Sequence, residues 1–136
     1  MSYWVVGAMW GGDAEDDALP GFLKRGYWYC WDAKDTPSDE ESKGSGNSVK
    51  AQRERFAQIK ISDRIAVKKN LSIKNQEIEI RAVGIVNDID LDEWRIYVDW
   101  LPVFQEKKVV DMKGCSASVH GPFESDSHWI KDIFCI

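Results

Sequence analysis

Aromatic residues occupy four of five consecutive positions in the stretch 26–32, which reads GYWYCWD. Successive side chains of a strand point to opposite faces, so a strand here puts Trp28 and Cys30 on one face and Trp31 with two tyrosines on the other. One set can join a core, and the other then presents rings near the carboxylate of Asp32. Ring faces beside a hydrogen-bonding carboxylate suit a flat ligand such as a nucleobase, although a tryptophan-rich barrel wall explains any single ring equally well.

Length and composition indicate one globular domain, residues 1–136. A chain of 136 residues can build one hydrophobic core without disulfides, and its apolar (43%) and charged (30%) fractions are ordinary. Seven tryptophans are unusual for this size, so we expect several of them to do more than fill the core.

The charge of the chain is negative overall but unevenly spread. A formal net charge of −5 counts against generic nucleic-acid binding through phosphate neutralisation, while it leaves room for a local basic groove. Basic residues crowd the segment 60–81, and acidic residues gather at 13–17, 35–41 and 88–93. The sequence therefore permits a molecule with a positive and a negative side.

Three cysteines at wide spacing, Cys30, Cys115 and Cys135, do not suggest a disulfide framework. The first residues lack the basic start and apolar run of a signal peptide, and no apolar run approaches membrane-spanning length. We therefore expect a reduced, cytoplasmic compartment.

The beginning of the chain predicts a buried strand followed by a tight turn. Residues 3–9 are apolar and β-prone, and glycines at positions 7, 11 and 12 let the backbone turn or approach a ligand closely. Trp10 lies among these glycines, where it can fold back onto the core or cover a site.

Two helices and a long polar loop are predicted next. A proline near the start and a glycine at the end predict a short helix over 19–26. The segment 33–48 is polar and predicts a mobile loop, either a disordered insertion or a flap over a binding site. An amphipathic helix is predicted over 48–60, with its arginines mostly outward.

Alternating side chains predict strands over 65–69, 77–87 and 94–101. In the second of these, the even-numbered residues from 78 to 86 are expected to share one face. The acidic segment 88–93 is expected to be a turn, and 128–136 has a helix-like spacing that becomes a strand. Many short strands with little helix predict an α+β protein, a small mixed β-barrel of about five or six strands with two or three peripheral helices.

In this order, the elements resemble the PUA-like superfamily, above all its EVE and YTH branches. The matching parts are the opening YWVV at 3–6, the aromatic stretch 26–32, and a helix end at 55–60 that leads through a turn into the strand 62–67. The family's turn reads Lys-x-Gly-Asp, and Ser62 stands where the family usually has glycine. Segments 80–86 and 95–101 resemble the next two strands, so the resemblance covers nearly the whole chain.

The resemblance implies a non-catalytic reader of a modified, often methylated, base flipped out of DNA or, less often, RNA. Such domains often accompany a nuclease or a motor ATPase, fused or as a partner, in modification-dependent restriction and defence systems. The physics agrees, because burying one methyl group is worth only about 0.8 kcal/mol. A reader therefore needs a tight aromatic cage, in which stacking adds roughly 1–3 kcal/mol per base.

The resemblance also implies which residues contact the ligand. Those expected around the base are Trp10, Trp28, Trp31, Asp32, Ala8, Ser118 and His120. Those expected to hold phosphates at the barrel mouth are Lys68, Lys69, Asn70 and Arg64. The family's Trp-x-Gly-Val-Arg-Asn segment does not occur as such in this chain.

Other chemistry has less support in the sequence. Cys115, Ser118 and His120 match neither a nucleophile elbow nor a Cys–His signature, so we do not expect catalysis. The chain has no Cys-x-x-Cys pair, and we expect no metal and no cofactor. Two alternatives stay open: a protein–protein adaptor that uses the aromatic face, which the negative charge favours, and a small nucleotide-processing enzyme like the ASCH relatives of the superfamily.

Overall fold

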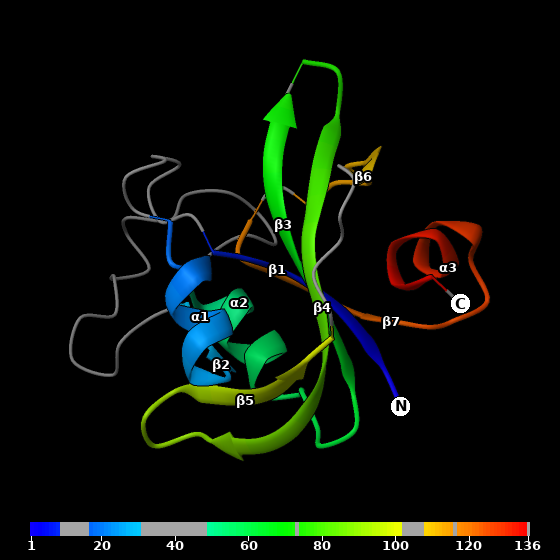
Figure 1. The fold of residues 1–136 in the computed structure, drawn as a ribbon. Coiled ribbons are helices and arrows are strands. Elements are labelled where there is room, and N and C mark those ends of the chain that lie inside the picture. The colour runs from blue at the N-terminus through cyan, green and yellow to red at the C-terminus, as the bar shows by residue number, and fades with distance from the viewer. Residues whose placement is uncertain (9–16, 31–48, 73, 102–107, 116, 136) are drawn as a thin grey trace.

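The computed structural model describes residues 1–8, 17–30, 49–72, 74–101, 108–115 and 117–135 (Figure 1). The predicted loop 33–48 and the predicted ligand contacts Trp10, Trp31 and Asp32 lie outside the described residues.

One seven-stranded sheet forms the body of the molecule. Its strands are β1 (Tyr3–Gly7), β2 (Tyr27–Trp28), β3 (Arg64–Ser72), β4 (Glu77–Asp90), β5 (Arg95–Trp100), β6 (Lys108–Asp111) and β7 (Val119–Phe123). The order across the sheet is β2-β5-β4-β3-β1-β7, and β6 pairs with the first residues of β4. β1 runs parallel to β3, and the other pairings among the described strands are antiparallel.

The sheet curls into a half-barrel, with α1 (Leu19–Arg25) and α2 (Val49–Phe56) on one side and α3 (His128–Phe134) on the other (Figure 1). This confirms a mixed α+β protein with a curled sheet. The described residues contain one strand more than the upper number expected, because β6 and β7 arise from segments without a clear sequence period. None of the described helices is long and apolar enough to cross a membrane.

Two apolar clusters lie on opposite faces of the sheet, and a β-bulge in β4 changes which of its residues point to each cluster. Lys68 of β3 pairs with Ile80, whereas Val67 pairs with Ala82, so Arg81 is an extra residue in β4. An extra residue reverses the alternation of faces beyond it. Ile80 therefore packs in the cluster that α3 covers, and Ala82 packs in the cluster that α1 and α2 cover. The prediction that the even-numbered residues from 78 to 86 share one face is wrong for this reason.

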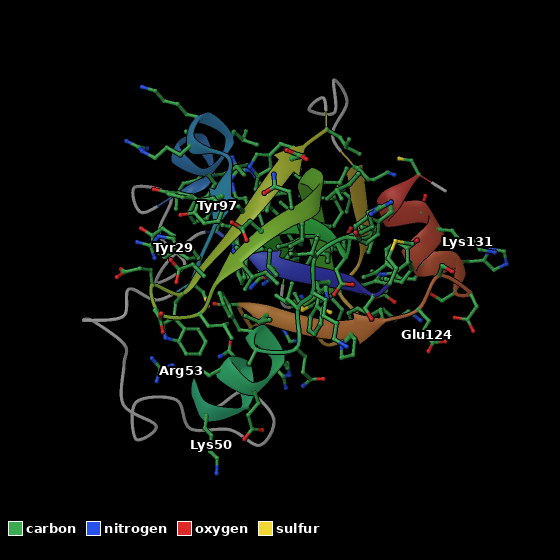
Figure 2. The ribbon with its side chains drawn as sticks, turned by 90° about the horizontal axis from the view of Figure 1, so that it is seen from below. Tyr29, Lys50, Arg53, Tyr97, Glu124 and Lys131 are labelled. Atoms are coloured by element: carbon green, nitrogen blue, oxygen red, sulfur yellow. The ribbon has the colours of Figure 1, made fainter. Side chains whose placement is uncertain are left out.

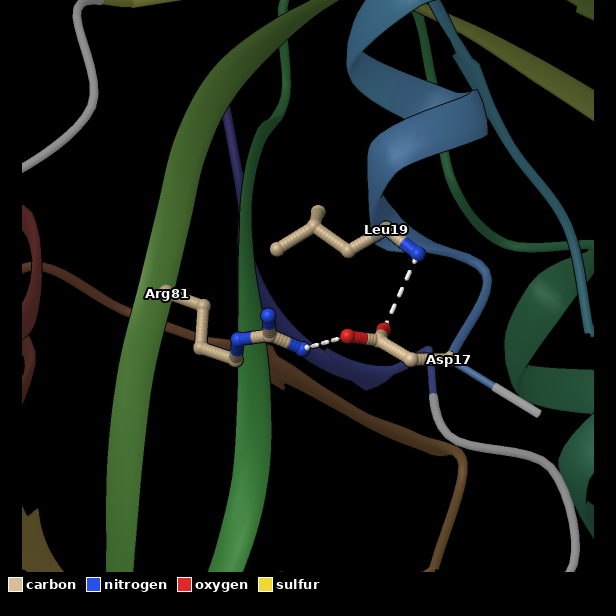
Figure 3. Close-up of polar contacts among 3 residues, drawn as sticks. All are labelled: Asp17, Leu19 and Arg81. Carbon is tan, nitrogen blue, oxygen red and sulfur yellow. Dashed lines mark hydrogen bonds and ion pairs between the residues drawn. The ribbon is translucent and has the colours of Figure 1, made fainter. Parts of the chain in front are cut away.

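The start of α1 is tied to this bulge. One carboxylate oxygen of Asp17 accepts a hydrogen bond from the N–H of Leu19 at 3.1 Å, and the other accepts one from Arg81 at 2.7 Å (Figure 3). The N–H of Ala18 donates to the carbonyl of Ala8 at 2.8 Å. These bonds hold the first turn of α1 against the end of β1 and against β4.

Two element boundaries differ from the sequence prediction. β4 continues to Asp90, because Ile89 and Asp90 still pair with β5, so the turn covers 91–94 instead of 88–93. The C-terminal segment is helix α3 without a following strand in the described residues. The side chain of Ser127 accepts from the N–H of Ile130 at the start of this helix, and Cys135 ends it in a left-handed conformation with φ of 58°.

Candidate functional site

The carboxyl end of β1 is where several predicted ligand contacts meet. Gly7 pairs in register with Lys68 of β3, and its N–H donates to the carbonyl of Ser118 at 2.9 Å. The carbonyl of Gly7 accepts from Nε1 of Trp28, also at 2.9 Å. A Cβ on Gly7 would lie 3.6 Å from Cα of Ser118 and 3.8 Å from Cε of Lys68, so even a methyl group there would touch both.

We call this group the β1-end site. Its members come from the end of β1 and the residue after it, from β3, and from β7 and the residue before it: Gly7, Ala8, Lys68, Asn70, Ser118 and His120. Five of them are residues that the sequence predicts around a base or a phosphate.

Lys68 brings a positive charge into the β1-end site. Its side chain is 5% exposed, and its ammonium donates a hydrogen bond of 2.8 Å to Oδ1 of Asn70. An ammonium has three hydrogens to donate, and the described residues give Lys68 neither a second hydrogen bond nor an ion pair. Burial lowers its pKa from 10.5 to about 8, with a smaller opposing effect from Cys115. The group therefore remains charged at neutral pH in an environment that disfavours charge.

His120 shapes the site as a neutral ring. Its Nε2 accepts a hydrogen bond from the N–H of Ala117 at 2.9 Å, which leaves the ring proton on Nδ1. Burial, and then the positive charges of Lys68 and Arg55, lower the pKa of His120 to about 4. His120 thus fixes the backbone before Ser118, and in this geometry it acts as a positioning residue.

Cys115 lies near Lys68 and is an unreactive thiol. It is 1% exposed, and burial raises its pKa to about 11, although the charges of Lys68 and Arg55 oppose the shift. Since the thiolate is the nucleophilic form of cysteine, this thiol is a poor nucleophile at neutral pH.

Helix α2 contributes two further residues to this region. The sequence predicted that Arg55 points outward, and it gave Gln52 no role. Gln52 is buried, and its Oε1 accepts from the N–H of Ser118 at 2.9 Å. Arg55 donates to the carbonyl of Val119 at 2.9 Å. Residues three apart share one face of a helix, so the pair could have been found by asking which polar residues lie beside the apolar face of Phe56.

Trp28 is part of the core and not an open stacking surface. It is 0% exposed, its ring stacks on Phe56 with centroids 5.4 Å apart, and its N–H is bonded to Gly7. An enclosed ring cannot accept a base on its face without repacking. The structure therefore corrects the expectation that Trp28 forms a cage wall, and it makes Trp28 the support beneath Gly7.

Two of the predicted phosphate contacts lie elsewhere. Arg64 pairs with Tyr3, at the opposite end of β1 from the pair of Gly7 and Lys68. Lys68 lies four positions after Arg64 along the strand, a separation of roughly 13 Å. Lys69 is adjacent to Lys68 but points to the opposite face of the strand, so neither basic side chain joins the β1-end site.

A second aromatic group, the tyrosine flank, consists of Tyr27, Tyr29, Tyr97 and Arg95. The rings of Tyr27 and Tyr29 lie edge to face with centroids 5.7 Å apart, and Tyr27 pairs with Tyr97 across β2 and β5. The guanidinium of Arg95 lies 3.6 Å from the ring centre of Tyr29. All four side chains are partly exposed, and Figure 2 shows Tyr29 and Tyr97 on the side of the molecule away from α3.

Within the described residues, no three His, Cys, Asp or Glu side chains gather as metal ligands. Comparison of the chain with protein-family models, with curated proteins and with solved structures found no match.

Proposed function

We propose that this chain is a non-catalytic binding module with a PUA-like fold that takes up a modified base of a nucleic acid, DNA in preference to RNA, at the β1-end site. The observation that carries the proposal is the buried ammonium of Lys68, which lies at the end of β1 without an ion pair among the described residues. A buried cation costs free energy in the unliganded protein, and a ligand that offers hydrogen-bond acceptors relieves that cost.

The turn before β3 supports the resemblance on which the fold part of the proposal rests. Ser62 has φ of 78°, in the left-handed region that favours glycine, and it occupies the position where the family usually has glycine. The next residue, Asp63, is buried, and its carboxylate accepts hydrogen bonds of 2.9 Å from Ser2, Trp4 and Lys60. The turn thus links the N-terminus to the start of β3.

The chemistry of the β1-end site favours binding over catalysis. The neighbouring thiol of Cys115 has a raised pKa, the imidazole of His120 has a lowered one, and Nε2 of that imidazole accepts a hydrogen bond from the backbone. A cysteine nucleophile would need a lowered thiol pKa and a nearby base that is free to take its proton.

A titration tests this proposal. Labelled oligonucleotides of one sequence, with and without modified bases, are added to the protein while tryptophan fluorescence and label anisotropy are followed. We expect saturable binding that requires a modified base. Ser118→Trp, which places a large ring among the site residues, should abolish it, whereas Lys131→Ala on α3 is the control and should bind normally. Failure to bind any oligonucleotide refutes the proposal.

The tyrosine flank supports a second candidate function, a protein–protein adaptor. Tyrosine and arginine are enriched at the centres of protein interfaces, and this group is partly exposed, beside the acidic turn at 91–94. Under this alternative, Tyr29→Ala abolishes capture of a partner protein, and no oligonucleotide binds.

A further inference from the structure

Lys68 also bears on which base the β1-end site accepts, an inference that rests on the function proposed above. The family resemblance implies that Lys68 holds a phosphate, yet the residue is 5% exposed and packs against Gly7. When a base is flipped into a protein site, the base enters the interior and the backbone phosphates stay near the surface. A group that reaches Lys68 therefore belongs to the base.

The surroundings of Lys68 offer few acceptors. The carbonyls of Gly7 and Ser118 already accept hydrogen bonds from Trp28 and Gly7, and Nε2 of His120 accepts one from Ala117. The remaining hydrogens of the ammonium have no acceptor among the described residues. An incoming base must supply that acceptor or leave the charge buried and under-bonded.

The charges around Lys68 also favour a ligand that brings oxygen atoms or negative charge. Within the part of the chain that the structure describes, Arg55 is the other charged side chain that shifts the pKa values of Cys115 and His120, and it is also positive. The carboxylate of Asp17 is engaged with Arg81 and the first turn of α1 (Figure 3). The described residues give the ammonium of Lys68 no carboxylate partner, so an oxygen-rich or anionic group on the ligand would offset its charge.

We propose that Lys68 makes the β1-end site selective for bases whose modification carries oxygen, most strongly a carboxylate, over bases that carry only a methyl group. A carboxylate accepts a charge-assisted hydrogen bond from the ammonium, a hydroxyl accepts a weaker one, and a methyl group accepts none. Lys68 is thus a specificity residue for the base and not a phosphate contact.

The test compares oligonucleotides of one sequence that differ at one position. The position holds cytosine, 5-methylcytosine, 5-hydroxymethylcytosine or 5-carboxylcytosine, and a fifth strand carries N6-methyladenine. Anisotropy gives the Kd of each. We expect the carboxylated strand to bind at least tenfold more tightly than either methylated strand, with the hydroxymethylated strand between them.

Two variants test whether Lys68 causes the selectivity. Lys68→Met should weaken the carboxylated complex at least tenfold and change the methylated ones less than twofold, while its thermal denaturation shows that it is folded. Lys69→Met, the matched control on the opposite face, should keep the order of affinities. Preference for a methylated strand, or an unchanged preference in Lys68→Met, overturns this inference while leaving the proposed function in place. Absence of binding to all five strands overturns both.

Discussion

Replacing Lys68 by methionine should stabilise the protein at neutral pH. The pKa of Lys68 falls from 10.5 to about 8 on folding, and one pKa unit corresponds to ~1.4 kcal/mol, so keeping this ammonium charged in the fold costs about 3 kcal/mol. Methionine has a similar length and no charge. It forfeits the hydrogen bond to Asn70, which contributes about 1 kcal/mol. We therefore expect Lys68→Met to raise the free energy of unfolding by about 2 kcal/mol at pH 7.

The stability that Lys68→Met gains over the wild type should decrease as the pH rises. Between about pH 8 and 10.5 the unfolded chain holds a proton on Lys68 that the folded chain has lost, so wild-type stability rises with pH across this window. The advantage of Lys68→Met should therefore shrink as pH rises and vanish near pH 10. Urea unfolding at pH 7 and pH 10 measures both values, with Lys69→Met as the control that should change stability by less than about 0.5 kcal/mol. A Lys68→Met protein that is less stable at pH 7, or whose advantage is the same at both pH values, would show that burial does not penalise the Lys68 ammonium.

Three further predictions concern other residues. His120 has a pKa of about 4 in the fold, below its ordinary value, so wild-type stability should fall by up to about 3 kcal/mol from pH 6.5 to 4. In His120→Gln this loss should be largely absent in acid titrations followed by circular dichroism, and an equally steep loss would contradict the assignment. Ser62→Gly should raise the free energy of unfolding by about 1 kcal/mol, because φ of 78° strains a residue with a Cβ; a lower midpoint of thermal denaturation would contradict this. A thiol reagent should modify Cys135 in the native protein but Cys30 and Cys115 only after unfolding, since the first is exposed and the others are buried; three fast thiols would show that the core is open.

Local signals in the sequence predicted most elements of the fold. Pro20 and Gly26 bracket α1 as expected, with Gly26 at φ of 71°, and the apolar run at the N-terminus is the buried strand β1. These predictions succeeded because they depend on backbone preferences and on the period of the side chains, which nearby residues set.

The errors arose where distant segments decide the local structure. The bulge at Arg81 is a property of the pairing between β3 and β4, and no residue in β4 alone indicates it. Trp28 was expected at a cage wall because aromatic residues look alike in sequence whether they line a site or a core; the stacking partner Phe56 comes from a helix 28 residues further on.

The sequence indicated which residues meet at the end of β1 better than it indicated their burial and protonation. Ala8, Ser118, His120 and Lys68 were named from the sequence and do meet at the end of β1. The burial of Lys68 and the neutrality of His120 depend on their surroundings in three dimensions, so neither could be read from residue order. Gln52 is buried for the same kind of reason, because its partner Ser118 lies far along the chain.

Mapping the residues that a nucleic acid contacts would show whether the base enters at the β1-end site. Nuclear magnetic resonance of the isotope-labelled protein, titrated with a single-stranded oligonucleotide that carries 5-carboxylcytosine, reports this residue by residue. We expect the largest shifts on Gly7, Ser118 and the side-chain ammonium of Lys68. Shifts confined to Tyr27, Tyr29 and Tyr97, or no shifts at saturating oligonucleotide, would contradict it.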